Sequence, residues 1–236
     1  MRLFLLLFLI LDLLHAKKIE ASYDVSYGVF SSLGVADAKF ESFDDGSYVI
    51  EVSAKATGLA KLLSGGRVET FSSYGIIKDD RLVPLKYSKT RSTSSKSTTR
   101  IYTFDHQNRA VIKESIKRDS YKKEPNEFYA SDDILSLFFN SSLFLKERKD
   151  HIAYAIGANK DDGKVEILFP QDGDLKKARK LLRSDGDLVI KVVLNEKIFS
   201  SSRDELLISL DEDGISSRAI LEDVLLFGDI VGTKRD

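Results

Sequence analysis

The sequence contains no cysteine, which excludes disulfide bonds, thiolate catalysis and metal sites built on cysteine. It has only 3 histidines, and none of them shows the HExxH or HxH spacing of zinc proteins, so we predict no protein-made metal site. With 3 prolines, the chain has no proline-rich linker that would divide it. Neither sign of charge dominates, because 36 Lys and Arg face 37 Asp and Glu, and this balance argues against a nucleic-acid-binding protein.

The common catalytic and phosphate-binding motifs are missing as well. The chain contains no GxSxG elbow to present a nucleophilic serine, and neither GxGxxG nor GxxxxGK[ST] to cradle a phosphate. We therefore predict that the protein is not an enzyme and uses no cofactor. A hydrolase whose acid pair is brought together only by the fold is the less favoured alternative.

The first 16 residues have the pattern of a secretory signal peptide. Arg2 precedes the apolar run 3–14, and the small residue Ala16 follows it. The run is shorter than the about 20 apolar residues that cross a bilayer. We expect this peptide to be removed and residues 17–236 to fold as a single domain in the periplasm, a compartment that suits an exported chain without cysteine. An uncleaved N-terminal membrane anchor is the alternative.

Most of the remaining chain alternates apolar and polar residues, which is typical of half-buried strands. Tyr23, Val25 and Tyr27, for example, alternate with polar residues. Turns rich in Asp and Gly separate the segments, as in an antiparallel meander. We therefore predict an all-β, mostly antiparallel fold, either a strongly curved sheet or a partly open β-barrel, with one or two short helices. The expected strands are 23–29, 35–43, 48–56, 67–78, 84–91, 98–105, 110–118, 150–158, 163–170, 187–198, 204–211 and 215–227.

Two segments depart from this alternation and are expected to be helical. In Asp132–Ser142 the first residues supply capping oxygens, and the apolar residues that follow cover most of the helical circumference. A short helix that is apolar nearly all round belongs inside the molecule, so we expect it against the concave side of the sheet. In Asp174–Arg183 the apolar residues share one face and the basic residues occupy the rest, which indicates a surface helix.

Charge is balanced overall but unevenly distributed along the chain. Residues 84–123 contain eleven bases and three acids, whereas residues 204–223 contain seven acids and one base. One interpretation is a basic face that meets anionic lipid headgroups or an acidic partner. The other is that the two segments are neighbouring strands that neutralise each other.

Several short motifs occur together in a characteristic order. Ser73-Tyr-Gly75 is followed by Leu82-Val-Pro84, then by Phe104-Asp105 and by Asp133-Ile-Leu-Ser136. With the closing segments 208–213 and 218–228, this order resembles a family of exported bacterial proteins catalogued as domain of unknown function 3108. The likeness runs from Tyr23 to Gly232, although Ser216-Ser217 stands where the family pattern has a proline. The resemblance implies a periplasmic, mostly antiparallel β protein and supplies no catalytic residues.

Two non-enzymatic functions follow from these expectations. A curved sheet with an apolar helix can leave a cavity, so the first is a periplasmic carrier or sensor of a lipid or other apolar small molecule. The second is a cell-envelope interaction or assembly protein with a closed core, whose charged faces bind another envelope protein or an anionic membrane surface. The residues expected to line a ligand cavity are Tyr23, Tyr27, Leu135, Phe138 and Phe139.

Overall fold

The computed structural model describes residues 17–28, 30–159, 161–184, 188–194, 205–222 and 228–235. The expected signal peptide, residues 1–16, lies outside the described residues. Within them, no helix has the length and apolar character that crossing a membrane requires.

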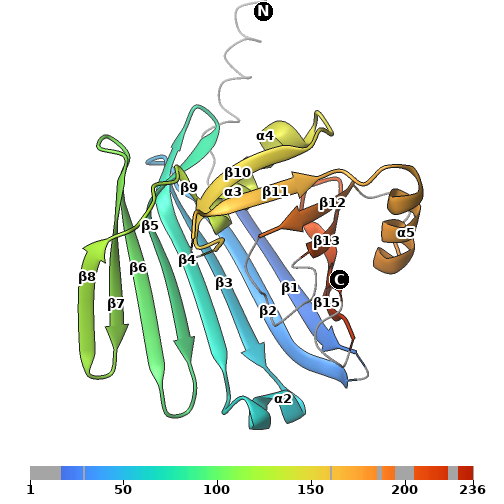
Figure 1. Cartoon of the computed structure of the whole chain (residues 1–236), viewed down its shortest axis with the longest axis horizontal. Coiled ribbons are helices and arrows are strands. Elements are labelled where there is room, and N and C mark those ends of the chain that lie inside the picture. The colour runs from blue at the N-terminus through green and yellow to red at the C-terminus, as the bar shows by residue number, and fades with distance from the viewer. Residues whose placement is uncertain are drawn as a thin grey trace, which may run out of the picture.

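In the described part of the chain, fifteen strands form one sheet, in the order β8-β7-β6-β5-β4-β3-β2-β1-β15-β14-β13-β12-β11-β10-β9 (Figure 1). Neighbouring strands are antiparallel except β9 and β10, which are parallel. The sheet does not close, since β8 and β9 form its two edges. The predicted all-β, mostly antiparallel class is therefore confirmed. The strands are β1 (Lys18–Tyr27), β2 (Phe30–Ser42), β3 (Ser47–Ala56), β4 (Val68–Lys78), β5 (Arg81–Ser92), β6 (Ser97–Asp105), β7 (Ala110–Lys117), β8 (Ser120–Pro125), β9 (Asp132–Asp133), β10 (His151–Ile156), β11 (Lys164–Leu168), β12 (Leu188–Val193), β13 (Glu205–Leu210), β14 (Ser216–Leu221) and β15 (Ile230–Lys234).

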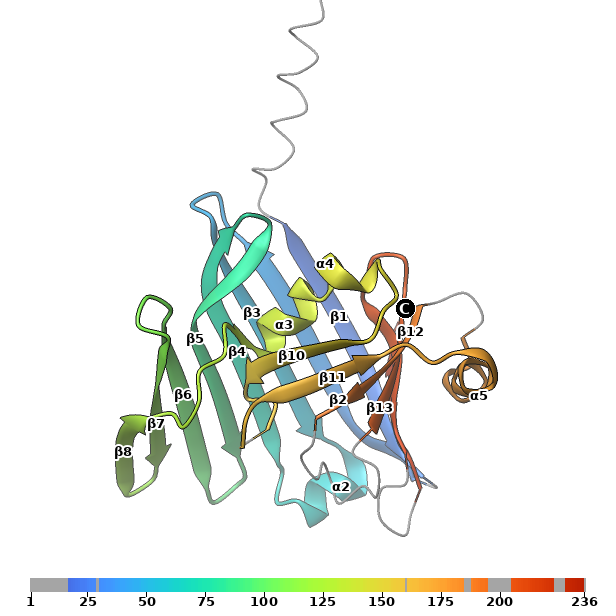
Figure 2. The ribbon, with the colours of Figure 1, turned by 45° about the horizontal axis from the view of Figure 1, so that its top comes forward.

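The sheet curls so that its second half crosses over one face of its first half. In both views β10 and β11 run across β3 and β4, with helix α3 (Ile134–Asn140) between the two layers (Figures 1 and 2). The short edge strand β9 is joined to β4 by the Ser73 hydroxyl, which donates to Asp133 Oδ2 at 2.6 Å. We call the face of β1–β7 that carries α3 the concave face.

Three apolar clusters hold α3 between these layers, and one of them packs Ile134 of the helix against Tyr87 and Ile156. Toward β10–β13, Leu137 packs among buried aliphatic side chains that include Ile190 and Ile208. Toward β2–β5, the partly buried Leu135 and Phe139 pack on a cluster that comprises Phe40, Tyr48, Ile50 and Leu82. The expected helix on the concave side is therefore present, and the space around it is filled by side chains.

Among the described residues, three further helices lie at the margins of the sheet. Helix α5 (Asp172–Leu182) packs its predicted apolar stripe, which includes Ala178 and Leu182, on Val189, Leu207 and Ile220. Because strand residues alternate between faces, these positions lie on the opposite face of β12–β14 from Ile190 and Ile208. Helix α4 (Ser142–Leu145) follows α3, and helix α2 (Gly58–Leu63) joins β3 to β4.

Two sequence expectations differ from the structure in detail. The expected helix Asp132–Ser142 begins only at Ile134, because its two aspartates form β9 and Asp133 serves as the cap of α3. The expected strand 215–227 is observed as β14 up to Leu221, and residues 223–227 lie outside the described part. Strands β8 and β15 were not predicted.

Candidate functional site

A group of buried polar side chains gathers at the start of α3. Asp133 Oδ2 accepts the Ser73 hydroxyl at 2.6 Å, and the Ser73 oxygen lies 3.2 Å from the Tyr48 hydroxyl. Asp133 Oδ1 accepts the backbone N–H groups of Leu135 and Ser136 at 2.8 and 3.0 Å. We call this group the Asp133 cluster. Its members, all buried, are Tyr48, Ser73, Asp132, Asp133, Ser136 and Asn140.

The local sequence explains why α3 starts at this point. Asp133 has an extended backbone and caps the helix, while the Ser136 hydroxyl lies 3.0 Å from the Asp133 N–H and completes a reciprocal capping box. Burial raises the pKa of Asp133 from 3.8 to about 6, and the hydrogen bonds from Ser73 and the two backbone N–H groups oppose that rise. Burial also raises the pKa of the Tyr48 hydroxyl.

Asp132 and Asn140 connect the same helix to the turn between β4 and β5. Arg81 forms an ion pair with Asp132, and Asn140 Nδ2 donates to Asp132 Oδ1 at 2.6 Å. The Asn140 side chain also satisfies both backbone groups of Leu82, accepting its N–H and donating to its carbonyl, each at 2.9 Å. The cluster thus fastens α3 to the sheet by hydrogen bonds that its members make with one another and with the backbone.

Three of the motifs that carry the family resemblance meet at this cluster, through Ser73, Leu82 and Asp133. Ser73 and Asp133 bond directly, and Gly75 lets the backbones of β4 and β5 approach, since a Cβ there would lie 2.1 Å from the Val83 carbonyl oxygen. The carbonyl of Pro84 accepts from His106 Nε2 at 2.6 Å, and His106 Nδ1 lies 2.9 Å from the Tyr129 hydroxyl. The shared motifs therefore build the attachment of α3.

The five expected ligand-lining residues do not form one group. Phe139 stacks on Phe40 with ring centroids 4.8 Å apart, and Leu135 packs on the same cluster, so both belong to the filled core. Phe138 is 38% exposed and takes no part in that contact. Tyr23 and Tyr27 lie on β1 and are half-buried, and burial together with the nearby Asp211 raises the pKa of Tyr23.

Beyond α3, the concave face continues as rows of paired residues across the strands. One row runs from Ala21 through Ala38 and Val52 to Phe71, and then through Lys89 to Arg100. The next row runs from Tyr23 through Ala36 and Ala54 to Glu69, and then to Arg91. Val52 and Ala54 follow Ile50 at alternate positions of β3, so they share its concave face. We call these residues the concave strip: its alanine, valine and phenylalanine members are the apolar part, and Lys89, Arg91 and Arg100 are the cationic part.

The geometry of the concave strip places cations beside apolar side chains. The apolar part is half-buried, while Arg91 and Arg100 are exposed. The Lys89 ammonium lies 5.0 Å from the centroid of the Phe71 ring, and Arg91 Nε donates to Glu69 at 2.7 Å. No single stretch of sequence encodes the strip, because it takes one or two residues from each of β1–β6. Sequence reasoning found its basic bias and one of its members, Tyr23.

The sheet order decides how the charged segments relate. The basic segment 84–123 forms most of β5–β8, whereas the described part of the acidic segment 204–223 forms β13 and β14. Five strands, β4, β3, β2, β1 and β15, separate β5 from β14 in the sheet. The interpretation that the two segments are neighbouring strands that neutralise each other is therefore wrong.

A polar groove of about 640 Å³ lies on the opposite face of β1–β5. Its polar side chains include Ser22 and Asp37, which hydrogen-bond each other at 2.8 Å, and Ser72 and Ser88, whose hydroxyl oxygens lie 2.9 Å apart. These side chains pair with one another, and the lining also includes Ala21, Ala38, Val52 and Phe71 of the concave strip.

Comparisons with known proteins give a family and a fold. A family model described as "Protein of unknown function (DUF3108)" matches residues 22–156, which include the motifs from Ser73 to Ser136. A search of curated proteins finds no match. Among solved structures, the chain is similar to a β-barrel-like protein of domain of unknown function DUF1849 from Brucella abortus. That likeness has a TM-score of 0.52 and 8% identity, and it covers 92% of this chain and 95% of the other. At this identity the likeness concerns the fold alone.

Proposed function

This chain belongs to the DUF3108 family, and we propose that it is a non-enzymatic carrier or sensor of a lipid with an anionic headgroup. The observation that carries the proposal is the concave strip, where half-buried apolar side chains stand next to exposed cations. We further propose that the protein works in the periplasm, because residues 1–16 have the pattern of a signal peptide.

The two parts of the strip suit the two parts of such a ligand. Alanine carries only a methyl group, so Ala21, Ala38 and Ala54 leave room above the sheet for an acyl chain. Each methylene that leaves water there contributes about 0.8 kcal/mol. Arg91 and Arg100 present guanidinium groups, which bind phosphate oxygens through paired hydrogen bonds. The filled space around α3 directs the ligand to the strip rather than to the helix.

A closed-core envelope protein is the second candidate, and the Asp133 cluster favours it. Apolar side chains pack around α3 between the layers, and the hydrogen bonds of the Asp133 cluster fix the start of the helix. Both features are expected of a helix whose role is purely structural. In that case the cations of β5 and β6 bind an acidic partner protein, the association weakens as salt rises, and no lipid is bound.

Titration with a short-chain phosphatidylglycerol separates the two candidates. Ala54→Trp places a bulky ring on the apolar part, and Arg100→Glu reverses a charge on the cationic part. Each should weaken binding by about tenfold or more. The matched controls are Lys55→Trp and Lys86→Glu, which alter the opposite face of β3 and β5. Equal binding by all four variants, or no binding by the unaltered protein, would contradict the carrier proposal.

A further inference from the structure

The loop between β3 and β4 presents an apolar tip to solvent. Helix α2 exposes Leu62 to 76% and Leu63 to 89%, the largest values among the big apolar side chains of the described residues. Gly58 before these leucines and Gly65 after them adopt positive φ, which turns the chain sharply on either side of the helix. The connection between β3 and β4 is thus a short projection that exposes two leucines at its end. A tight polar turn would have been enough to connect the two strands.

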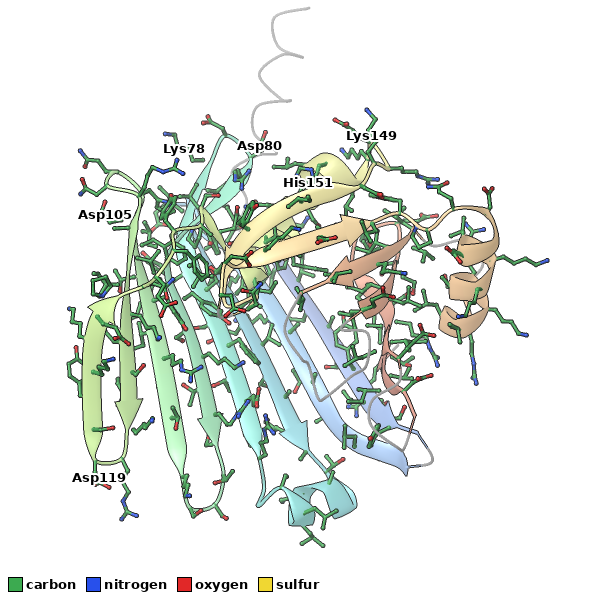
Figure 3. The ribbon with its side chains drawn as sticks, in the orientation of Figure 1. Lys78, Asp80, Asp105, Asp119, Lys149 and His151 are labelled. Carbon is green, nitrogen blue, oxygen red and sulfur yellow. The ribbon has the colours of Figure 1, made fainter. Side chains whose placement is uncertain are left out.

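Cations lie within this tip and on its β5 side. Lys61 lies in α2 itself and is exposed. The turn between β5 and β6 sits against the α2 loop, because the Ser94 N–H donates to the Gly65 carbonyl at 2.9 Å, and this turn carries the exposed Lys96. The turn between β7 and β8 lies at the same end of the sheet and adds Lys117 and Arg118 beside one acid, Asp119 (Figure 3).

The other end of the same strands carries the opposite bias. There the turns and the adjoining strand ends carry five acids, Asp44, Asp45, Asp79, Asp80 and Asp105, and three bases, Lys78, Arg81 and Arg109. Figure 3 shows Asp80 and Asp105 at the end away from Asp119. The first half of the sheet is therefore polarised along its strands, with the exposed leucines at its basic end.

We propose that this basic end, made of α2 and the two neighbouring turns, docks on an anionic lipid bilayer. Leu62 and Leu63 enter the boundary between headgroups and acyl chains, and Lys61 and Lys96 contact the lipid phosphates. A bilayer is the occupant that fits, because the exposed leucines stand on a projection that has the exposed Lys61 and Lys96 beside it. A protein partner would need a complementary surface of about 800 Å² on this side. The proposal goes beyond lipid binding in the concave strip, since it concerns a different surface and a membrane rather than a single lipid.

Vesicle sedimentation tests the proposal, with vesicles of phosphatidylcholine alone and of phosphatidylcholine mixed with phosphatidylglycerol. We expect the protein to sediment with the anionic vesicles at about 0.1 M salt and to be released at about 1 M, where the Debye length falls from about 10 to about 3 Å. The double variant L62S/L63S should lose about tenfold or more in partitioning, and K61E/K96E should lose as much at low salt.

Matched controls come from apolar and charged residues elsewhere on the surface. Ile152 and Tyr154 on β10 are 54% and 51% exposed, so I152S/Y154S removes as many exposed apolar side chains without touching the tip. Lys78→Glu reverses a charge at the opposite end of the sheet. Both controls should sediment like the unaltered protein, and thermal unfolding should be the same for L62S/L63S, because its side chains lie in solvent.

Three outcomes would overturn the proposal: no binding to anionic vesicles, equal loss in the controls, or unaltered binding by L62S/L63S. If the leucines instead join two copies, light scattering will show a dimer that L62S/L63S abolishes, without any vesicle binding, and this result also rejects the bilayer. The concave strip is tested separately, since L62S/L63S should still bind short-chain phosphatidylglycerol, whereas Arg100→Glu should lose it. Failure of one proposal is thus distinguishable from failure of the other.

Discussion

Replacing Asp133 by Asn should change how the stability of the protein depends on pH. Burial raises the pKa of Asp133 from 3.8 to about 6, and the neighbouring Asp132 adds to that rise. The folded protein holds the Asp133 proton more tightly than the unfolded chain does, so the protonated carboxyl stabilises the folded state. This contribution to the free energy of unfolding is fully present below about pH 4 and is lost as the pH rises through about 6. A difference of about two pKa units corresponds to about 3 kcal/mol in the free energy of unfolding.

Asparagine is a suitable replacement because it caps helices as well as aspartate does and carries no charge to desolvate. The variant's amide oxygen can still accept from the N–H groups of Leu135 and Ser136, and its NH₂ group can donate to the Ser73 oxygen. Urea unfolding of both proteins at several pH values measures the effect. Between pH 4 and pH 7, the unaltered protein should lose about 3 kcal/mol more than Asp133→Asn does. Parallel stability curves for the two proteins would refute this account of the cluster.

Three further substitutions test the attachment of α3. Phe139→Ala should lower the free energy of unfolding by about 3–5 kcal/mol, because Phe139 packs in the core, and Phe138→Ala should cost clearly less because Phe138 is partly exposed. Equal losses in urea unfolding would contradict this packing. Asn140→Ala leaves both backbone groups of Leu82 buried without partners, so it should cost about 2 kcal/mol or more. An unchanged thermal midpoint for Asn140→Ala would show that water replaces the amide.

Much of the fold could be predicted from the sequence because each strand carries its own alternation. In β3, for example, Tyr48 and Ile50 are buried in the core, whereas Glu51 between Ile50 and Val52 faces solvent, as the alternating pattern predicts. The start of α3 was also within reach, since Asp133 supplies a capping oxygen directly before an apolar run. Helix α2 escaped prediction because six residues are too few to show a helical period.

The candidate sites depend on pairings that a linear pattern does not contain. Ser73 and Asp133 are 60 positions apart and meet only because the sheet curls until β9 reaches β4. The concave strip likewise exists only when Val52, Phe71 and Lys89 lie side by side in register. Phe138 and Phe139 were both expected to line a cavity, and only the orientation of α3 in the fold separates the exposed ring of Phe138 from the partly buried ring of Phe139, which stacks on Phe40.

The central claim is that the protein binds a lipid with an anionic headgroup, and native mass spectrometry of the protein purified from its own cells tests it most directly. The account predicts a species heavier than the polypeptide by the mass of one phospholipid, and a smaller fraction of that species in Arg100→Glu than in Lys86→Glu. A spectrum that contains only the bare polypeptide, before and after incubation with phosphatidylglycerol, would contradict the claim and favour the closed-core envelope protein.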